Sequence, residues 1–236
     1  MNTVIHRADS RGVADHGWLH SRHTFSFANY HDPERMGFGK LRVINDDIVK
    51  GGGGFGTHPH DNMEIISVPL SGALRHRDSM GNTHVIRQGD VQIMSAGSGL
   101  THSEYNDSAS APVNFLQIWV MPRKRNIEPR YGQKAFEHAD RHNRFQTVVA
   151  PEDDSDAVWI NQDAWFSLGD FDAGRGGHCQ ARKPGNGLYL FVIEGQIEIA
   201  GQTLGKRDGI GIADAGKPDI RAVADSQLLL MDVPME

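Results

Sequence analysis

The chain has 236 residues, of which 38% are apolar and 23% are charged, with 27 glycines and a formal charge of −6. This composition is typical of a turn-rich globular protein and excludes the disordered and fibrous classes. The acidic balance gives no general attraction to nucleic acid or to anionic lipid, so neither is an expected partner.

The sequence also indicates a compartment. Cys179 is the single cysteine and cannot form a disulfide within the chain, which agrees with a reducing environment. No apolar run approaches the roughly eighteen residues that span a membrane. The N-terminal residues lack the basic and then apolar order of a signal peptide, so we expect a cytoplasmic protein.

Short apolar segments of strand length follow one another along the chain, separated by Gly, Asn or Asp. They lie at residues 40–49, 64–72, 90–99, 113–122, 188–195, 196–201 and 227–234. Strands of this length and spacing predict an all-β sandwich or barrel. Helical periodicity is weak, and we expect only a turn or two of helix, around residues 131–142.

The two halves of the chain share a faint repeat. In each half an apolar strand, a Gly turn and a return strand precede a Gly/Asp turn and a closing Ala-Gly, at residues 68–97 and 192–216. Chance likeness between glycine-punctuated strands is the alternative, but duplication of one β-barrel explains both length and pattern. The Pro- and Arg-rich connector near residues 122–133 predicts domains over residues 1–133 and 134–236.

The histidines are concentrated in the first half, where twelve of the thirteen lie at or before His142. In THPHDNMEI, residues 57–65, His58 and His60 are two positions apart, so a strand would project both imidazoles from one face. His102 and Glu104 repeat this spacing about forty residues later. If the two strands meet inside a barrel, three imidazoles and a carboxylate reach one point.

Such a set predicts a metal site. Neutral imidazole and carboxylate ligands suit Fe(II), Mn, Ni, Cu or Zn, and the absence of thiolates argues against a structural zinc of the finger type. Glu64 is the alternative carboxylate, because strand parity would place it on the face of His58 and His60. It is expected either as a ligand or as an acceptor that orients an imidazole N–H.

The remaining histidines are interpreted as structural. His16, His20, His23 and His31 are expected on the surface or in hydrogen-bonded loops, and His76 beside a turn. Alignment of the halves without gaps on Gly72/Gly195 and Gly97/Gly216 places Ala181, Lys183, Arg221 and Val223 at the ligand positions. The second barrel is therefore predicted to be metal-free.

Two motifs carry a family resemblance: G-x5-H-x-H-x3-E from Gly52 to Glu64, and G-x-G-x-x-H-x3-N from Gly97 to Asn106. They resemble the two sequence motifs of the cupin superfamily. More narrowly, the chain is similar to the pirin family and to its bacterial pirin-like quercetin dioxygenases. The segments that carry this likeness are HGWLHSRHTFSFANYHDP, LRVINDD, GFGTHPHDNMEI, HRDSMGN, QIMSAGSGLTHSEYN, IWVMP and PRY.

The resemblance implies a bicupin, two β-barrels packed face to face with the metal only in the N-terminal one. It implies His58, His60, His102 and Glu104 as ligands of one divalent transition metal, with Fe(II) expected and Mn, Ni, Cu, Co and Zn open. The implied activity is that of an oxidoreductase, a quercetin 2,3-dioxygenase that cleaves flavonols with O2 and releases CO.

In that activity Glu104 would be both ligand and catalytic base. The partners would be a flavonol-like aromatic substrate and O2. We expect the chain to be a monomer. Two alternatives stay open. One is a non-catalytic, metal-dependent and redox-responsive regulatory protein that binds a protein partner. The other is a closed, tetrahedral and inert zinc site.

Overall fold

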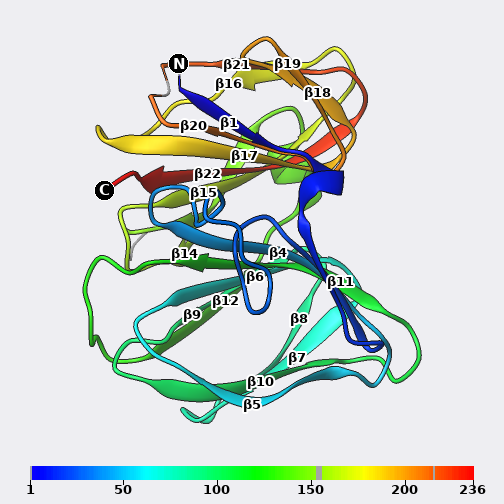
Figure 1. Ribbon diagram of the computed structural model, residues 1–236, viewed down its shortest axis with the longest axis vertical. Coiled ribbons are helices and arrows are strands. Elements are labelled where there is room, and N and C mark those ends of the chain that lie inside the picture. Colours follow the sequence, from blue (N-terminus) through cyan, green and yellow to red (C-terminus); the bar gives the residue numbers. More distant parts are fainter. Residues whose placement is uncertain (1, 153–155, 215) are drawn as a thin grey trace.

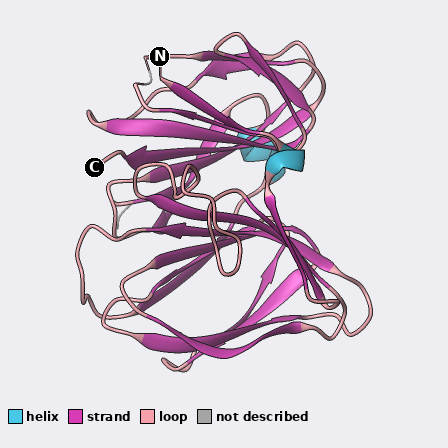
Figure 2. Cartoon of the chain, in the orientation of Figure 1, coloured by secondary structure: helices cyan, strands magenta, loops and turns pink. Residues whose placement is uncertain are grey.

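The computed structural model describes residues 2–152, 156–214 and 216–236. Strands in four sheets dominate these residues, and helix is confined to two short 3-10 turns, η1 (Ala8–Ser10) and η2 (His138–Arg141) (Figure 2). The all-β prediction is confirmed. The helical turn expected around residues 131–142 is present as η2, whereas the residues before it form a strand. Within the described ranges, no helix has the length and apolar character needed to cross a membrane.

The first half of the chain forms a barrel from two sheets. The larger sheet contains, in spatial order, β12 (Arg130–Ala135), β9 (Asp90–Ser95), β6 (Glu64–Ser71), β11 (Val113–Val120), β4 (Leu41–Val49), β3 (Leu19–His23) and β2 (Gly12–Asp15). The smaller sheet contains β5 (Gly54–His60), β10 (Leu100–Asn106), β7 (Ala73–Asp78) and β8 (Thr83–Arg87). The two sheets enclose the interior of the first barrel.

The second half repeats this arrangement. Its larger sheet contains β1 (Thr3–His6), β20 (Gly209–Ile212), β17 (Asn186–Glu194), β22 (Ser226–Pro234), β15 (Trp165–Phe171), β13 (Phe145–Ala150) and β14 (Val158–Trp159). Its smaller sheet contains β16 (Gly176–His178), β21 (Asp219–Ala222), β18 (Gln196–Ile199) and β19 (Gln202–Gly205). The order β9-β6-β11-β4 matches β20-β17-β22-β15, and β5-β10-β7-β8 matches β16-β21-β18-β19. This correspondence supports duplication of one barrel.

The large sheets of the two barrels meet in the middle of the molecule. Figure 1 shows β16, β18, β19 and β21 at its upper end and β5 and β10 at its lower end. One apolar cluster contains Ile66, Leu116 and Ile118 of the first barrel together with Phe166 and Phe191 of the second. Because strand side chains alternate between faces, each large sheet packs one face on its neighbour and turns the other into its own barrel.

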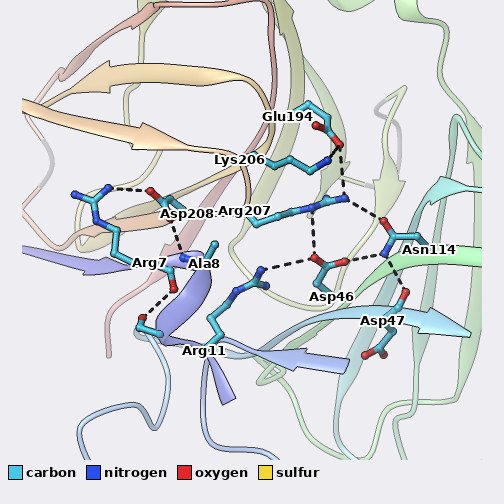
Figure 3. A network of polar contacts seen from close by, with 11 residues as sticks. Arg7, Ala8, Arg11, Asp46, Asp47, Asn114, Glu194, Lys206, Arg207 and Asp208 are labelled. Atoms are coloured by element: carbon cyan, nitrogen blue, oxygen red, sulfur yellow. Dashed lines mark hydrogen bonds and ion pairs between the residues drawn. The ribbon is translucent and has the colours of Figure 1, made fainter. Parts of the chain in front are cut away.

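A polar network crosses the same interface (Figure 3). Asp46 of β4 accepts a hydrogen bond from Asn114 Nδ2 at 2.7 Å and lies 3.3 Å from Nε of Arg207. Arg207 belongs to the turn between β19 and β20, and Arg11 approaches Asp46 at 3.7 Å from the segment after η1. Asp46 thus joins the first barrel to two arginines, one of them in the second barrel.

The N-terminal strand belongs to the sheet of the second barrel. Strand β1 pairs with β20 of the second barrel, whereas β12 pairs with β9 of the first. The division after residue 133 falls inside β12 and remains a proposal.

The interiors of the two barrels differ in chemistry. The second barrel is filled by an apolar cluster that includes Leu188, Ile199, Ile220, Leu228 and Leu230. In the first barrel, buried polar side chains share the space with smaller apolar clusters. These buried polar side chains include His76, Asn45, Asp47, Ser67, His102, Glu104 and Gln117. Burying polar groups costs free energy unless they are paired, so the polar interior of the first barrel is the candidate location of a functional site.

Candidate metal centre

Three histidines converge inside the first barrel. His58 and His60 lie on β5 and His102 lies on β10, where His102 is the register partner of His58. The ring centroids are 4.4 Å apart for His58 and His102, 4.9 Å for His60 and His102, and 4.8 Å for His58 and His60. One nitrogen from each ring lies within 4.8 Å of the other two. We call His58, His60 and His102 the imidazole cluster.

The glycine run before His58 permits this approach of β5 to β10. A Cβ atom on Gly54 would lie 2.6 Å from Cα of Tyr105, a distance that real side chains do not reach. At the start of β10, Gly97 has φ +51°, and a Cβ atom there would lie 2.2 Å from the Ile127 carbonyl oxygen. Only glycine tolerates both the close contact and the left-handed backbone.

The cluster has the electrostatics of metal ligands. Burial lowers the pKa of His60 to about 4 and that of His102 to about 2, so both rings are neutral at neutral pH. Neither nitrogen of His102 has a hydrogen-bond partner among the described residues, although the side chain is only 2% exposed. Nδ1 of His58 lies 2.7 Å from the Gly56 carbonyl oxygen, and a proton on Nδ1 leaves Nε2 free as an electron-pair donor.

Glu104 lies beside the cluster but is held by other groups. Its Oε1 accepts a hydrogen bond from Ser67 Oγ at 3.2 Å, and its Oε2 accepts one from Gln117 Nε2 at 2.9 Å. The pairing of β10 with β5 shifts register between His102 and Glu104, so Glu104 does not repeat the alignment of His102. Burial raises the pKa of Glu104 to about 7.

His76, predicted to be a structural residue beside a turn, also lies close to His102 and Glu104. It lies on β7 directly opposite Glu104, is fully buried, and its Nε2 lies 3.1 Å from Asp78 Oδ2. Ligand atoms of His76, His102 and Glu104 also lie within 4.8 Å of one another. His102 therefore belongs to two clusters. The alternation of His76 and Asp78 has the same i, i+2 spacing as the other pairs, and that spacing was the available signal.

Glu64 does not lie on the strand of the two histidines. His60 ends β5, while Glu64 begins β6 in the other sheet, and Asn62 between them has φ +47°. Strand parity therefore does not apply, because the turn resets the direction of the side chain. Oε2 of Glu64 accepts hydrogen bonds from Ser95 Oγ at 2.7 Å and from the Asn161 amide at 3.1 Å, neither of which is an imidazole.

The cluster opens into a cavity of about 370 Å³ between the two sheets of the barrel. Aromatic side chains line part of it, namely Trp18, Phe27, Phe55 and Trp119. His16 lines the cavity and lies exposed in the loop between β2 and β3, as expected. His23 also lines it, but lies on β3 and is only 3% exposed, which corrects its interpretation as a surface or loop residue. His31 is exposed, as expected. The cavity gives a flat molecule of modest size access to the imidazoles.

The second barrel lacks this chemistry at the equivalent positions. When Gly195 is matched to Gly72, Ile199 corresponds to His76. Ile199 pairs with Ile220, just as His76 pairs with Glu104, so Ile220 corresponds to Glu104. The alignment without gaps placed Val223 rather than Ile220 at the position of Glu104, so it missed the structural equivalent. Both isoleucines belong to the apolar cluster of the second barrel. The absence of metal there remains a prediction.

Burial of Glu64 predicts a pH-dependent stability. Its side chain is fully buried, and desolvation raises its pKa from 4.5 to about 7. Folding therefore favours the protonated form, and the free energy of unfolding falls as the pH rises from 4.5 past 7, by up to about 3 kcal/mol from this group. Glu64→Gln keeps the hydrogen-bond acceptor but cannot ionise. We expect its stability relative to the unsubstituted protein to increase with pH.

Urea unfolding of the metal-stripped proteins between pH 5 and pH 8 measures this difference. The exposed Glu128→Gln serves as the matched control, because it removes a carboxylate that folding does not bury. A stability difference between Glu64→Gln and the unsubstituted protein that stays constant across this pH range would contradict the expectation.

Family models match both halves of the chain. The model described as Pirin matches residues 5–120, and the model described as Quercetinase C-terminal cupin domain matches residues 147–233. The protein named quercetin 2,3-dioxygenase from Escherichia coli (strain K12) is 42% identical over 234 residues, which cover 98% of each chain. The pirin-like protein of Caulobacter vibrioides is 42% identical over 225 residues, covering 95% of this chain and 96% of the relative.

A solved structure extends the likeness to the fold. The crystal structure of the bacterial pirin YhhW from Escherichia coli in complex with nickel(II) superimposes with a TM-score of 0.93 at 40% identity, and the match covers 99% of both chains. The two barrels described above are therefore cupin domains, and the predicted bicupin is confirmed. With relatives this similar over nearly its whole length, the chain belongs to the pirin family.

Proposed function

We propose that this chain is a metal-dependent quercetin 2,3-dioxygenase, which cleaves flavonols between C2 and C3 with O2 and releases CO. The observation that carries the proposal is the imidazole cluster, whose three rings meet at one end of a cavity large enough for an aromatic substrate. Relatives 42% identical over nearly the whole chain bear the name of this activity.

The residues present fit one divalent transition metal. Both nitrogens of buried His102 lack a hydrogen-bond partner among the described residues, and burial keeps His60 neutral, so imidazole nitrogens are available as ligands. His58, His60 and His102 would hold the ion, with Glu104 as the fourth ligand. Fe(II) is the metal we propose, with Mn, Ni, Cu, Co and Zn as alternatives, and one relative has been crystallised with nickel(II). When bound, the ion supplies a positive charge that stabilises the anion of a substrate hydroxyl group.

Glu104 is proposed to remove the proton of the flavonol 3-hydroxyl. Ser67 and Gln117 fix the direction of its carboxylate, which keeps it in place to accept a proton from a substrate held at the imidazole cluster. Loss of the proton leaves an electron-rich enolate, which is the form of the substrate that reacts with O2.

The aromatic wall of the cavity is proposed to orient the flat substrate and exclude water from the reactive anion. Trp119 belongs to this wall and packs edge-on against two rings. Its ring centroid lies 5.0 Å from that of His60 and 5.3 Å from that of Phe27. Trp18 and Phe55 form a second edge-on pair at 5.1 Å.

Turnover of quercetin tests the function directly. Protein loaded anaerobically with Fe(II), and in parallel with Mn, Ni, Cu or Co, is given quercetin and then O2. We expect loss of the flavonol absorption with matching consumption of O2 and release of CO. Unchanged absorption with every metal would exclude the dioxygenase. A protein that instead binds one partner in stoichiometric amounts, with an affinity changed by His58→Ala, would be of the regulatory kind.

A further inference from the structure

The wall of the cavity that faces the imidazole cluster is polar and incompletely paired. The imidazole cluster belongs to the small sheet, whereas Ser21, His23, Asn45, Asp47 and Gln117 lie on β3, β4 and β11 of the large sheet. All five line the cavity and are no more than 8% exposed. We call these five residues the polar wall.

Strand register makes the polar wall continuous. His23 pairs with Asn45 across β3 and β4, and Gln117 pairs with Asn45 across β4 and β11. Ser21 pairs with Asp47 two residues further along the same strands, and therefore on the same face. Side chains of directly paired residues project side by side, so the five polar groups form one surface on the barrel interior.

Four members of the polar wall keep a buried polar atom without a hydrogen-bond partner among the described residues, whereas the Ser21 hydroxyl group lies beside Asp47 and interacts with its carboxyl group. The four atoms are His23 Nδ1, Asn45 Oδ1, Asp47 Oδ1 and Gln117 Oε1. Leaving such an atom unpaired in the interior destabilises the folded protein. Three of them are amide or carboxyl oxygens, which accept hydrogen bonds. A ligand that satisfies the polar wall must therefore present several hydrogen-bond donors.

The cupin fold itself does not require polar groups here. Strand β22 of the second barrel corresponds to β11, and it turns Leu228 and Leu230 into an apolar interior. Burial also raises the pKa of Asp47 to about 7, because desolvation disfavours its charged form. Unfavourable groups that persist in a cavity are typical of binding sites, where stability is lost in exchange for recognition.

We propose that the polar wall recognises the phenolic hydroxyl groups of a planar aromatic substrate, with Asp47 selecting for hydroxyl groups on the rings not held at the imidazole cluster. The proposal rests on the proposed function for the orientation of the substrate. Phenolic O–H groups are donors on a flat apolar body, so they match unpaired acceptors between aromatic walls.

Two probes separate recognition from chemistry. Quercetin and 3-hydroxyflavone share the 3-hydroxyl group, but only quercetin carries phenolic hydroxyl groups on its other rings. Anaerobic binding to the Fe(II)-loaded protein is followed by quenching of tryptophan fluorescence, because Trp18 and Trp119 line the cavity. We expect quercetin to bind about 10- to 100-fold more tightly than 3-hydroxyflavone.

The variant Asp47→Leu replaces the carboxyl group by an apolar side chain of similar size. We expect the preference for quercetin to fall by about tenfold or more and the thermal midpoint to stay or rise, because an unpaired buried polar group is removed. Ser21→Ala is a smaller change in the same wall and should shift the preference in the same direction. The exposed His84→Ala is the matched control outside the cavity and should keep the full preference.

The outcomes distinguish this proposal from the proposed function. Equal affinity for both probes in the unsubstituted protein, or an unchanged preference in both Asp47→Leu and Ser21→Ala, would overturn the recognition proposal even if both flavonols are oxidised. If these variants abolish the preference and neither flavonol is turned over, the recognition proposal is supported and the proposed dioxygenase activity is excluded. Absence of binding by both probes would overturn both.

Discussion

Replacing His102 by alanine is expected to lower the affinity for a divalent transition metal by more than about 100-fold and to abolish quercetin turnover. His102 is the only residue shared by the two clusters of potential ligands, and both of its nitrogens lack other partners among the described residues. Changes to residues that merely support metal ligands already cost about 10- to 100-fold, so loss of a central imidazole should cost more. Competition with a chromogenic chelator measures the affinity.

The matched control is His84→Ala, which removes an exposed imidazole that stacks on Tyr131 outside the cluster. It should keep the metal affinity of the unsubstituted protein. If His102→Ala folded, as judged by its circular dichroism spectrum, and still bound metal as tightly as His84→Ala, the imidazole cluster would not be the metal centre.

Phe166→Ala is expected to destabilise both barrels together, by about 3–5 kcal/mol. Phe166 lies on β15 of the second barrel, is fully buried, and belongs to the apolar cluster that also contains Ile66 and Leu116 of the first. Because the two large sheets share this core, a cavity opened on one side removes contacts from both. Urea unfolding followed by tryptophan fluorescence and by circular dichroism should give coincident transitions that shift to lower urea.

Val223→Ala provides the control, because Val223 is 38% exposed and its truncation should change stability by no more than about 0.5 kcal/mol. Two separate transitions in Phe166→Ala, with the first barrel unfolding at its usual urea concentration, would show that the barrels are independent units rather than one cooperative structure.

The strands were readable from the sequence because local patterns encode them. In β4 and β11, apolar side chains are concentrated in runs of strand length, and Ile44, Leu116 and Ile118 face the shared core. The pair His58 and His60 was equally readable, since two residues at i and i+2 of any strand share a face.

Other features were hidden because they depend on how strands are joined and paired. The turn at Asn62 moves Glu64 to another sheet, and a register shift in β10 separates Glu104 from the alignment of His102. The segment LRVINDD predicts a strand, yet nothing in it shows that Asp46 faces an arginine of the second barrel while Asp47 faces the cavity. Both aspartates are buried, which local polarity would not predict.

By itself the sequence determined the strand content, the duplicated barrel and the three histidines of the imidazole cluster, because side-chain alternation and glycine geometry act over a few residues. Only the tertiary structure decided that His76 approaches Glu104 and that the polar wall faces the cluster. These neighbours come from strands far apart in the chain, and their proximity depends on register and on the closure of two sheets around one cavity.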